Sequence, residues 1–349
     1  MFDPIIILTL LFEGLANGAI YAFMALGIVV LYSVTNVINV AVGEFAMLAA
    51  LTAVSFRAQE TPGTLYILIA GFLAWGVLDV IRFARENQLQ KGLIRFAILL
   101  ALSAGLFLLV SLVARTNTPY FVQVLLALFM VTLLGPLCHR LMVQPLPKGS
   151  ILVFLILTIG LHLALTGLGL AFWGADAYNL PSIQKGGTSI ANVYMTYQNL
   201  WLLGIAAVLM LLLYIFFIHT IYGKALRAAA VNKLGARLSG ISSLQAGRLS
   251  FTISAFLAAV AGILITPVTK MVYDLGFLMG LKGFVAAVIG GLVNPAGAAL
   301  AGFLVGVAEQ FGAFYISSTY KDVLIFAMLI PVLMIRSIQH HDLEEHVDD

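Results

Sequence analysis

The sequence predicts an all-α protein that crosses a membrane many times, with about eight to ten transmembrane helices. Of its 349 residues, 62% are hydrophobic and only 9% are charged, whereas soluble proteins carry roughly 25% charged residues. Four stretches lack Asp, Glu, Lys and Arg altogether, and each exceeds the about 20 residues that a spanning helix needs. These stretches are 14–43, 149–175, 186–223 and 283–308. The strict polar–apolar alternation of a membrane β-barrel is missing, which leaves helices.

The same composition excludes several classes of function. So few charged residues cannot cover a soluble enzyme or keep a chain disordered, and one cysteine, Cys138, cannot form an internal disulfide. The net charge of +3 is too small to indicate a nucleic-acid partner. No zinc-ligand spacing, H-E-x-x-H motif, G-x-S-x-G motif or phosphate-binding G-x-x-x-x-G-K-[ST] loop occurs in the sequence. We therefore expect no catalytic residue, no metal site and no ATPase in this chain.

Hydropathy divides the chain into ten candidate spans within a single membrane domain of residues 1–349. They are 5–33, 40–56, 64–81, 95–114, 119–138, 150–173, 200–218, 249–268, 283–312 and 322–336. The ninth is too long for one ordinary span and contains Asn294-Pro295 in a glycine-rich run. Proline removes a backbone donor and disfavours helix in the residue before it. The sequence therefore predicts a broken helix near 290–297.

Positive charge is concentrated in three connections, those after the third, fifth and seventh spans. These connections contain or adjoin Arg82, Arg85, Lys91, Arg95, Arg140, Lys148, Lys224, Arg227, Lys233, Arg237 and Arg248. All three fall on one side of the membrane, and the positive-inside rule makes that side the cytoplasm. The N-terminus is then outside. The side of the acidic tail, residues 337–349, depends on whether 283–312 counts as one span or two.

Polar side chains inside apolar spans are costly, so they indicate either a pathway or interhelical contacts. Glu13, Asn17 and Tyr21 recur every four residues and share one face of the first helix. They are candidates for a polar stripe that lines a transport pathway. Hydrogen bonds between helices are the alternative explanation for the same three residues.

A second polar group lies where the first predicted span meets the second. Asn36, Asn39 and Glu44 can form a broken-helix site that meets a substrate. The alternative is helix capping, with Asn39 before an apolar helix and Glu44 near its positive end. Asn294 belongs to the predicted break near 290–297, which either lines the pathway or is a simple turn between helices.

Three other polar features have simpler explanations. Thr158 and His162 share a face of the sixth span, where a lone histidine usually packs through hydrogen bonds. Asp79 lies one turn before Arg82, as expected of a pair at a helix end. Glu309 lies near the end of its span and fits either a gate or an interfacial acid.

The connection 219–248 predicts a short amphipathic helix of about four turns that ends near Gly240. Leu226, Ala230, Leu234 and Leu238 recur every four residues, while basic residues occupy the other faces. Binding to anionic lipid is one explanation. The absence of Trp and Phe and the modest apolar stripe favour docking into a groove of a cytoplasmic protein. A transporter without its own phosphate-binding loop needs an ATPase on a separate polypeptide, and such a subunit would dock here.

Four blocks of sequence resemble the permease subunits of branched-chain amino acid ATP-binding cassette importers, specifically the H-type permease. They are NGAIYAFMALGIVVLYSVTNVINVAVGEFAML at 17–48, HRLMVQPLPKGSILVFLILTIGLHL at 139–163 followed by NLPS at 179–182, YGKALRAAAVNKLGARLSGI at 222–241, and GLKGFVAAVIGGLVNPAGAALAGFLVGVAEQF at 280–311. None is diagnostic alone. Their shared order makes the resemblance fairly specific, and it covers most of the chain outside 60–118.

The resemblance implies a bacterial inner-membrane permease subunit that binds no cofactor itself. It implies pairing with a second homologous permease, two ATPase subunits that use ATP, and a periplasmic protein that delivers the amino acid. Residues 223–240 would be the cytoplasmic coupling helix that receives the movement of the ATPase. The coupling residues would be Gly223, Arg227, Asn232, Leu234, Leu238 and Gly240. Close relatives in the family carry urea or short amides instead.

The sequence departs from the family pattern in two places. Val40 and Val42 stand where family members usually have an aromatic residue and a histidine. Residues 60–118 look like an inserted helix pair joined by a basic loop. Two other classes of function also fit a bundle with buried polar groups. A secondary transporter or channel would need no docking helix but usually more buried charge, and a membrane enzyme would need a catalytic constellation.

Overall fold

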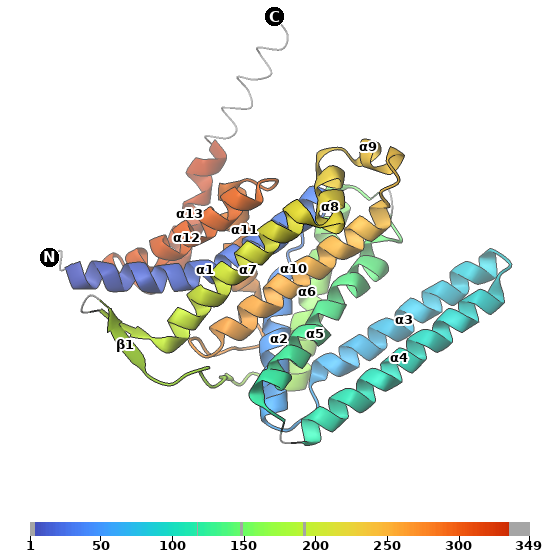
Figure 1. The fold of residues 1–349 in the computed structure, drawn as a ribbon, viewed down its shortest axis with the longest axis horizontal. Coiled ribbons are helices and arrows are strands. Elements are labelled where there is room, and N and C mark those ends of the chain that lie inside the picture. Colours follow the sequence, from blue (N-terminus) through green and yellow to red (C-terminus); the bar gives the residue numbers. More distant parts are fainter. Residues whose placement is uncertain (1–3, 117, 147–148, 191–192, 335–349) are drawn as a thin grey trace, which may run out of the picture.

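The computed structural model of this protein describes residues 4–116, 118–146, 149–190 and 193–334, and its described part is almost entirely helical (Figure 1). The helices are α1 (Pro4–Thr35), α2 (Val42–Arg57), α3 (Gly63–Arg85), α4 (Leu89–Arg115), α5 (Tyr120–Cys138), the π-helical turn η1 (His139–Val143), α6 (Ile151–Trp173), α7 (Tyr197–His219), α8 (Ile221–Val231), α9 (Lys233–Leu238), α10 (Ser243–Ile265), α11 (Leu275–Gly290), α12 (Pro295–Tyr315) and α13 (Lys321–Ala327). One short hairpin joins β1 (Gly187–Ile190) to β2 (Val193–Thr196).

Eight segments of the described chain are long and apolar enough to cross a membrane, which confirms a polytopic helical membrane protein. Ten spans were expected, and the difference lies in two helices that are too short, α2 and α13. The expected spans 40–56 and 322–336 correspond to α2, with 16 residues, and α13, with seven. The expected span 283–312 is divided between α11 and α12. The acidic tail 337–349, the basic residue Lys148 and the last residues of the tenth expected span lie outside the described residues.

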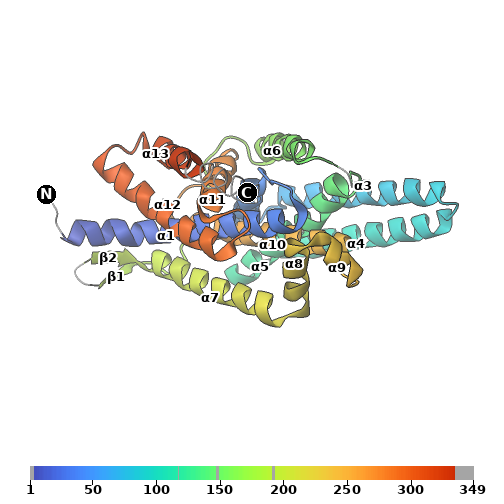
Figure 2. The same cartoon turned by 90° about the horizontal axis from the view of Figure 1, so that it is seen from above.

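The centre of the molecule is built from α1, α2 and α10. These helices bury most of their side chains, whereas α4 and α7 bury only a few of theirs. Figure 2 shows α7 on one side of this centre and α6 with α13 on the other. Apolar side chains on the outer helices face hydrocarbon instead of water, so their exposure costs nothing in a bilayer.

A glycine seam joins α1 to α12, which run antiparallel. A Cβ atom added at Gly302 would lie 2.4 Å from Ala22 Cα, and one at Gly306 would lie 2.3 Å from Gly18 Cα. No side chain fits between two backbones this close, so only glycine is possible at these positions. Small residues allow such close approach in membrane bundles, where dispersion forces hold helices together.

The predicted break in the helix near 290–297 is confirmed. Gly291 adopts φ 97°, a left-handed conformation that glycine tolerates and other residues avoid. Asn294 then caps α12, because its Oδ1 atom accepts a hydrogen bond from the backbone N–H of Gly297 at 3.1 Å. Pro295 occupies the first position of α12, where its missing N–H is not needed. The break is a tight turn between two helices.

Helices α3 and α4, which fall within the expected insertion 60–118, form a hairpin that extends away from the bundle (Figure 1). The two helices leave the bundle near α5 and diverge from it toward their connecting turn, which contains Asn87 at φ 55°. A buried ion pair ties the hairpin to the bundle. In it the Arg140 guanidinium of η1 donates a hydrogen bond to Asp79 of α3. Sequence analysis paired Asp79 with Arg82, but Arg82 pairs with Glu86 instead.

Candidate functional site

Between α1 and α2 the chain leaves the helical path for residues 36–41, inside the bundle. Asn36 begins the break with φ 60°. Asn39, 1% exposed, accepts a hydrogen bond at Oδ1 from the backbone N–H of Ala41 at 3.2 Å. From α6, the hydroxyl of Thr158 donates to the carbonyl oxygen of Ile38 at 3.0 Å. Irregular backbone at membrane depth is tolerated only where protein buries it or it lines a cavity.

A carboxylate–histidine pair lies directly beside this break. Glu44 occupies the first turn of α2 and is fully buried. Its Oε1 atom lies 2.6 Å from Nδ1 of His162, which is on α6. The His162 ring stacks on Phe277 of α11 with centroids 4.5 Å apart, and the Thr166 hydroxyl lies 3.3 Å from the same Nδ1 atom. Helices α2, α6 and α11 therefore converge on one polar site.

Two polar atoms at this site have no hydrogen-bond partner among the residues that the structure describes. They are Nδ2 of Asn39, a donor, and Oε2 of Glu44, an acceptor. Buried polar atoms are nearly always paired, and each exception asks for an explanation. A bound polar molecule would supply the missing partners. Within the described part of the chain, no group of three or more His, Cys, Asp or Glu residues is placed to hold a metal ion.

Backbone contact fixes the position of α11 at this site. A Cβ atom added at Gly43 would lie 1.8 Å from the carbonyl oxygen of Gly276, so both positions must be glycine. The Glu44 carboxylate also lies against Gly276, where an added Cβ would come within 2.8 Å of Oε2. The start of α2 and the start of α11 thus form a rigid wall behind the carboxylate.

The other residues proposed for the pathway lie apart from this site. Glu13 is exposed and Asn17 is half-buried on α1, whereas Tyr21 is buried. The structure does not gather them into one buried stripe. Asn36 is exposed at the break, and Asn294 is exposed and acts as the cap of α12. Of the residues proposed from the sequence, Asn39 and Glu44 come together, and sequence analysis did not pair Glu44 with His162.

Tyr21 belongs to a second buried network, which joins α1, α11, α12 and α13. Its hydroxyl donates to Oε2 of Glu309 at 2.5 Å. Lys282 Nζ lies 2.7 Å from Glu309 Oε1 and 2.7 Å from Asp322 Oδ1. Lys282 also lies over the Tyr21 ring, 5.5 Å from its centroid. Each charge has an opposite partner, so this network fits a structural clamp between helices.

The predicted coupling helix at 223–240 is two helices, α8 and α9, which meet at Asn232. The prediction of a single amphipathic helix in this segment is therefore wrong. Asn232 has an extended backbone, and its Oδ1 atom accepts a hydrogen bond from the Gly235 N–H at 2.9 Å, which makes it the N-cap of α9. Gly240 follows α9 with φ 84° and ends it. Asparagine is a common N-cap residue, so Asn232 could have indicated from the sequence alone that a new helix begins here.

The break also changes which side chains share a face. Leu226 is buried in a small apolar cluster with Val34 of α1, while Leu234 is 68% exposed and Leu238 is 82% exposed. Gly223 is buried and Arg227 is exposed. Burial and the nearby Arg237 lower the pKa of Lys233 from its ordinary value. We call the exposed apolar residues of these helices the α8–α9 patch. They are Ile221, Tyr222, Val231, Leu234 and Leu238.

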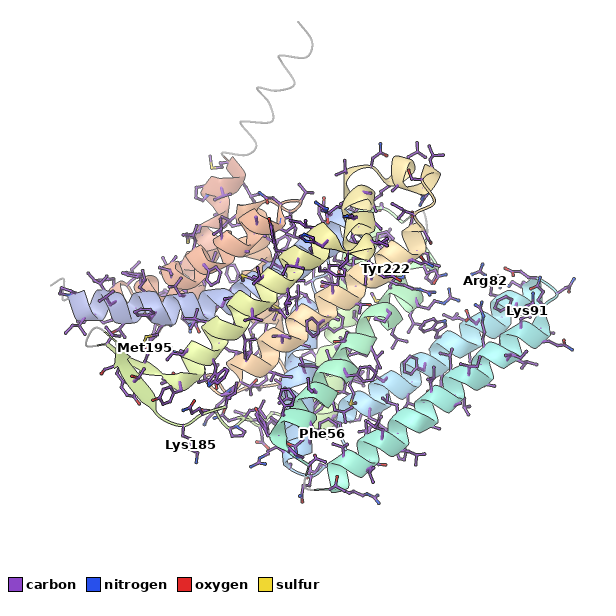
Figure 3. All side chains as sticks on the ribbon, in the orientation of Figure 1. Phe56, Arg82, Lys91, Lys185, Met195 and Tyr222 are labelled. Carbon is purple, nitrogen blue, oxygen red and sulfur yellow. The ribbon has the colours of Figure 1, made fainter. Side chains whose placement is uncertain are left out.

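Figure 3 shows Tyr222 of this patch at the end of the molecule that also carries the tip of the α3–α4 hairpin, near Arg82 and Lys91. A hollow of about 550 Å³ lies beneath α8 and α9, lined by Val34, His139, Gln144, Lys233 and Arg237 among others. The three basic connections thus meet at one end of the bundle. We assign this end to the cytoplasm by the positive-inside rule.

Comparisons with known proteins agree along nearly the whole chain. A family model described as branched-chain amino acid transport system / permease component matches residues 10–333. The high-affinity branched-chain amino acid transport system permease protein BraD of Pseudomonas aeruginosa is 31% identical over 289 residues, covering 79% of this chain and 91% of BraD. The corresponding protein LivH of Escherichia coli is 28% identical over 333 residues, covering 93% and 92%. No solved structure matches the chain.

Proposed function

This chain belongs to the family of branched-chain amino acid transport permease components, and from that membership we propose that it carries branched-chain or other hydrophobic amino acids as a subunit of an ATP-binding cassette importer. It is a multi-pass protein of the bacterial inner membrane. Its relatives BraD and LivH are named as transport permeases and not as enzymes. We assign it no catalytic residue and no bound cofactor.

The proposal includes a set of partners. Permeases of this kind work with an ATPase and a substrate-binding protein. We propose two ATPase subunits that bind the ATP, a second homologous permease, and a periplasmic binding protein that delivers the substrate. The α8–α9 patch supports the ATPase contact, because five large apolar residues are exposed there at the cytoplasmic end. Such side chains suit a protein groove.

We further propose that the substrate passes beside Glu44 and Asn39. A free amino acid carries an ammonium group and a carboxylate, and each needs a partner when it leaves water. Glu44 Oε2 is an acceptor without a donor, and Asn39 Nδ2 is a donor without an acceptor, among the described residues. The two atoms match the two charged groups of the substrate. The His162–Glu44 contact keeps the carboxylate oriented.

The runner-up substrate is urea or a short amide, as in other members of the family. Such molecules are neutral and would gain less from a buried carboxylate than an ammonium group would. The unpaired Glu44 oxygen therefore favours an amino acid. A secondary transporter or channel is the second alternative, and it differs from the proposal because it would work without an ATPase.

Reconstitution tests the proposal directly. The chain is placed in vesicles together with the permease, ATPase and binding protein that co-purify with it in mild detergent. We expect ATP-dependent uptake of radiolabelled leucine that excess isoleucine or valine inhibits and that excess urea does not. Uptake by the chain alone without nucleotide would establish a secondary transporter or channel. Inhibition by urea instead of valine would establish an amide permease.

A further inference from the structure

A pocket of about 410 Å³ separates the α3–α4 hairpin from the bundle. It lies where the last turns of α3, the first turns of α4, the η1 turn and the start of α10 come together. Figure 1 shows the hairpin diverging from α5 in this direction. A larger hollow of about 760 Å³ adjoins it on the outer side of α3, and the two share Arg82, Arg140 and Gln144 in their lining.

The lining of this pocket carries excess positive charge. It contains four arginines, Arg82, Arg95, Arg140 and Arg248, and one carboxylate, Asp79. Asp79 is buried and forms the ion pair with Arg140, and Arg95 NH1 lies 3.9 Å from its Oδ2 atom. Glu86, which lines the adjoining hollow, forms an ion pair with Arg82 at 3.2 Å. One buried carboxylate therefore faces three arginines.

Arg248 and Arg140 have donor atoms left over. Among the described residues, Arg248 has no carboxylate within ion-pair distance. Its guanidinium donates to Gln144 Oε1 at 3.5 Å and lies over the Trp75 ring, whose centroid is 5.5 Å away. The Nε atoms of Arg140 and Arg248 are buried without an acceptor in the described part of the chain. Arg140 itself is 7% exposed. An anionic ligand in the pocket would supply the missing acceptors.

The apolar walls indicate what kind of anion fits. Trp75, Ile98, Leu99 and Leu244 line the pocket, and Leu78 and Ile81 line the adjoining hollow. Ile98 is 54% exposed on a helix whose sequence is long and apolar enough to span the membrane. The pocket therefore continues from the arginines into the region of lipid tails. A soluble anion would use the arginines but leave these walls unoccupied.

We propose that this pocket binds an anionic phospholipid, with its phosphate among Arg95, Arg140 and Arg248 and its acyl chains along α3 and α4. The arginines lie at the end of the bundle that carries the basic connections, which is the leaflet side where anionic lipids attract basic residues. Bidentate guanidinium–phosphate bonds favour arginine in such sites. The lipid would fill the space between the hairpin and the bundle, as a third contact beside the Asp79–Arg140 pair.

Native mass spectrometry of the purified full chain tests this proposal. The protein is titrated with phosphatidylglycerol, with phosphatidylcholine, and with inorganic phosphate in competition. We expect phosphatidylglycerol to be retained preferentially and inorganic phosphate not to displace it. The double variant R95Q/R248Q should bind phosphatidylglycerol roughly thirtyfold more weakly, since each basic residue contributes about a fivefold factor at an anionic surface.

The matched control is R57Q/R115Q, which removes two exposed arginines outside the pocket lining. They are the last residues of α2 and α4. It should retain phosphatidylglycerol within about twofold of the unmodified chain. If R95Q/R248Q unfolds in detergent, Ile98→Trp fills the apolar wall without changing charge and should weaken lipid retention. Equal retention of the two lipids, unchanged binding in either pocket variant, or displacement by inorganic phosphate overturns the proposal. The last outcome would identify a site for soluble anions.

Discussion

Nδ1 of His162 lies 2.6 Å from Oε1 of Glu44, although 118 residues separate the two in the sequence. The contact joins the middle of α6 to the first turn of α2, next to the break between α1 and α2. This chain has Val42 two residues before Glu44, at the position where the family resemblance led us to expect a histidine. Here a histidine reaches the carboxylate from another helix. The valine at position 42 therefore does not leave Glu44 without a histidine neighbour.

Replacing Glu44 with glutamine tests the proposed substrate contact. E44Q keeps the shape of the side chain and removes its charge. A hydrogen bond to a charged group contributes about 1.5–3 kcal/mol, so we expect uptake to fall by at least about tenfold. The measurement is the initial rate of radiolabelled leucine uptake by the reconstituted transporter. The matched control, E60Q, changes an exposed carboxylate just beyond α2 and should leave the rate unchanged. Full activity in E44Q would show that the substrate does not depend on the Glu44 carboxylate.

Replacing Leu234 and Leu238 with aspartate tests the α8–α9 patch. Both side chains are exposed in the isolated chain, so L234D/L238D should fold and reach the membrane normally. Charges in an apolar groove are costly, and we expect the variant to lose ATP-driven uptake and to lose the ATPase on co-purification. S239D, which adds charge at an exposed polar residue of the same segment, should retain both. Unchanged uptake in L234D/L238D would reject the docking role.

Replacing Lys282 with methionine tests the clamp between α1, α11, α12 and α13. K282M leaves the buried carboxylate of Glu309 without its closest cation. Breaking a buried ion pair in this way costs about 3–5 kcal/mol of unfolding free energy. Denaturant unfolding in detergent measures the loss. The double variant K282M/E309M removes both charges and should recover a large part of it. A loss in K282M/E309M equal to the sum of the losses in K282M and E309M would show that the pair is not coupled.

Replacing Gly43 with alanine tests the backbone contact between α2 and α11. The new methyl group would lie 1.8 Å from the carbonyl oxygen of Gly276, so the two helices must separate. Overpacking of this kind costs about 3 kcal/mol, although alanine is the better helix former. G105A is the matched control, because no atom lies within 4 Å of a Cβ added there on α4. We expect the thermal unfolding midpoint to fall in G43A and to stay unchanged in G105A.

The long spans and the break at Gly291–Asn294 could be predicted because their signals are local. Hydropathy over about 20 residues identifies a span, and proline disfavours helix in the residue before it, here Asn294. Asn232 gave an equally local signal, a capping residue, but the four-residue spacing of the leucines concealed it. That spacing predicts one helix only when nothing interrupts it.

The pairs at the sites could not be predicted, because they depend on tertiary packing. His162 looked like an ordinary buried histidine until α6 was placed against α2, and the Lys282–Glu309 pair forms only where α11 meets α12. The ion pair between Arg140 and Asp79 likewise depends on the packing of α3 against the η1 turn. Single-sequence reasoning finds costly polar groups in apolar spans, but it does not identify the partner that satisfies each one.

The glycine seam between α1 and α12 has a mechanical consequence. Because the backbones of the two helices touch at Gly18, Gly302 and Gly306, we expect α1 and α12 to move together as one unit. Its α1 component has 32 residues and is about 48 Å long. Val34, near one end of α1, packs on Leu226 of α8. We therefore expect a displacement of α8 to be passed along α1 toward the opposite membrane face.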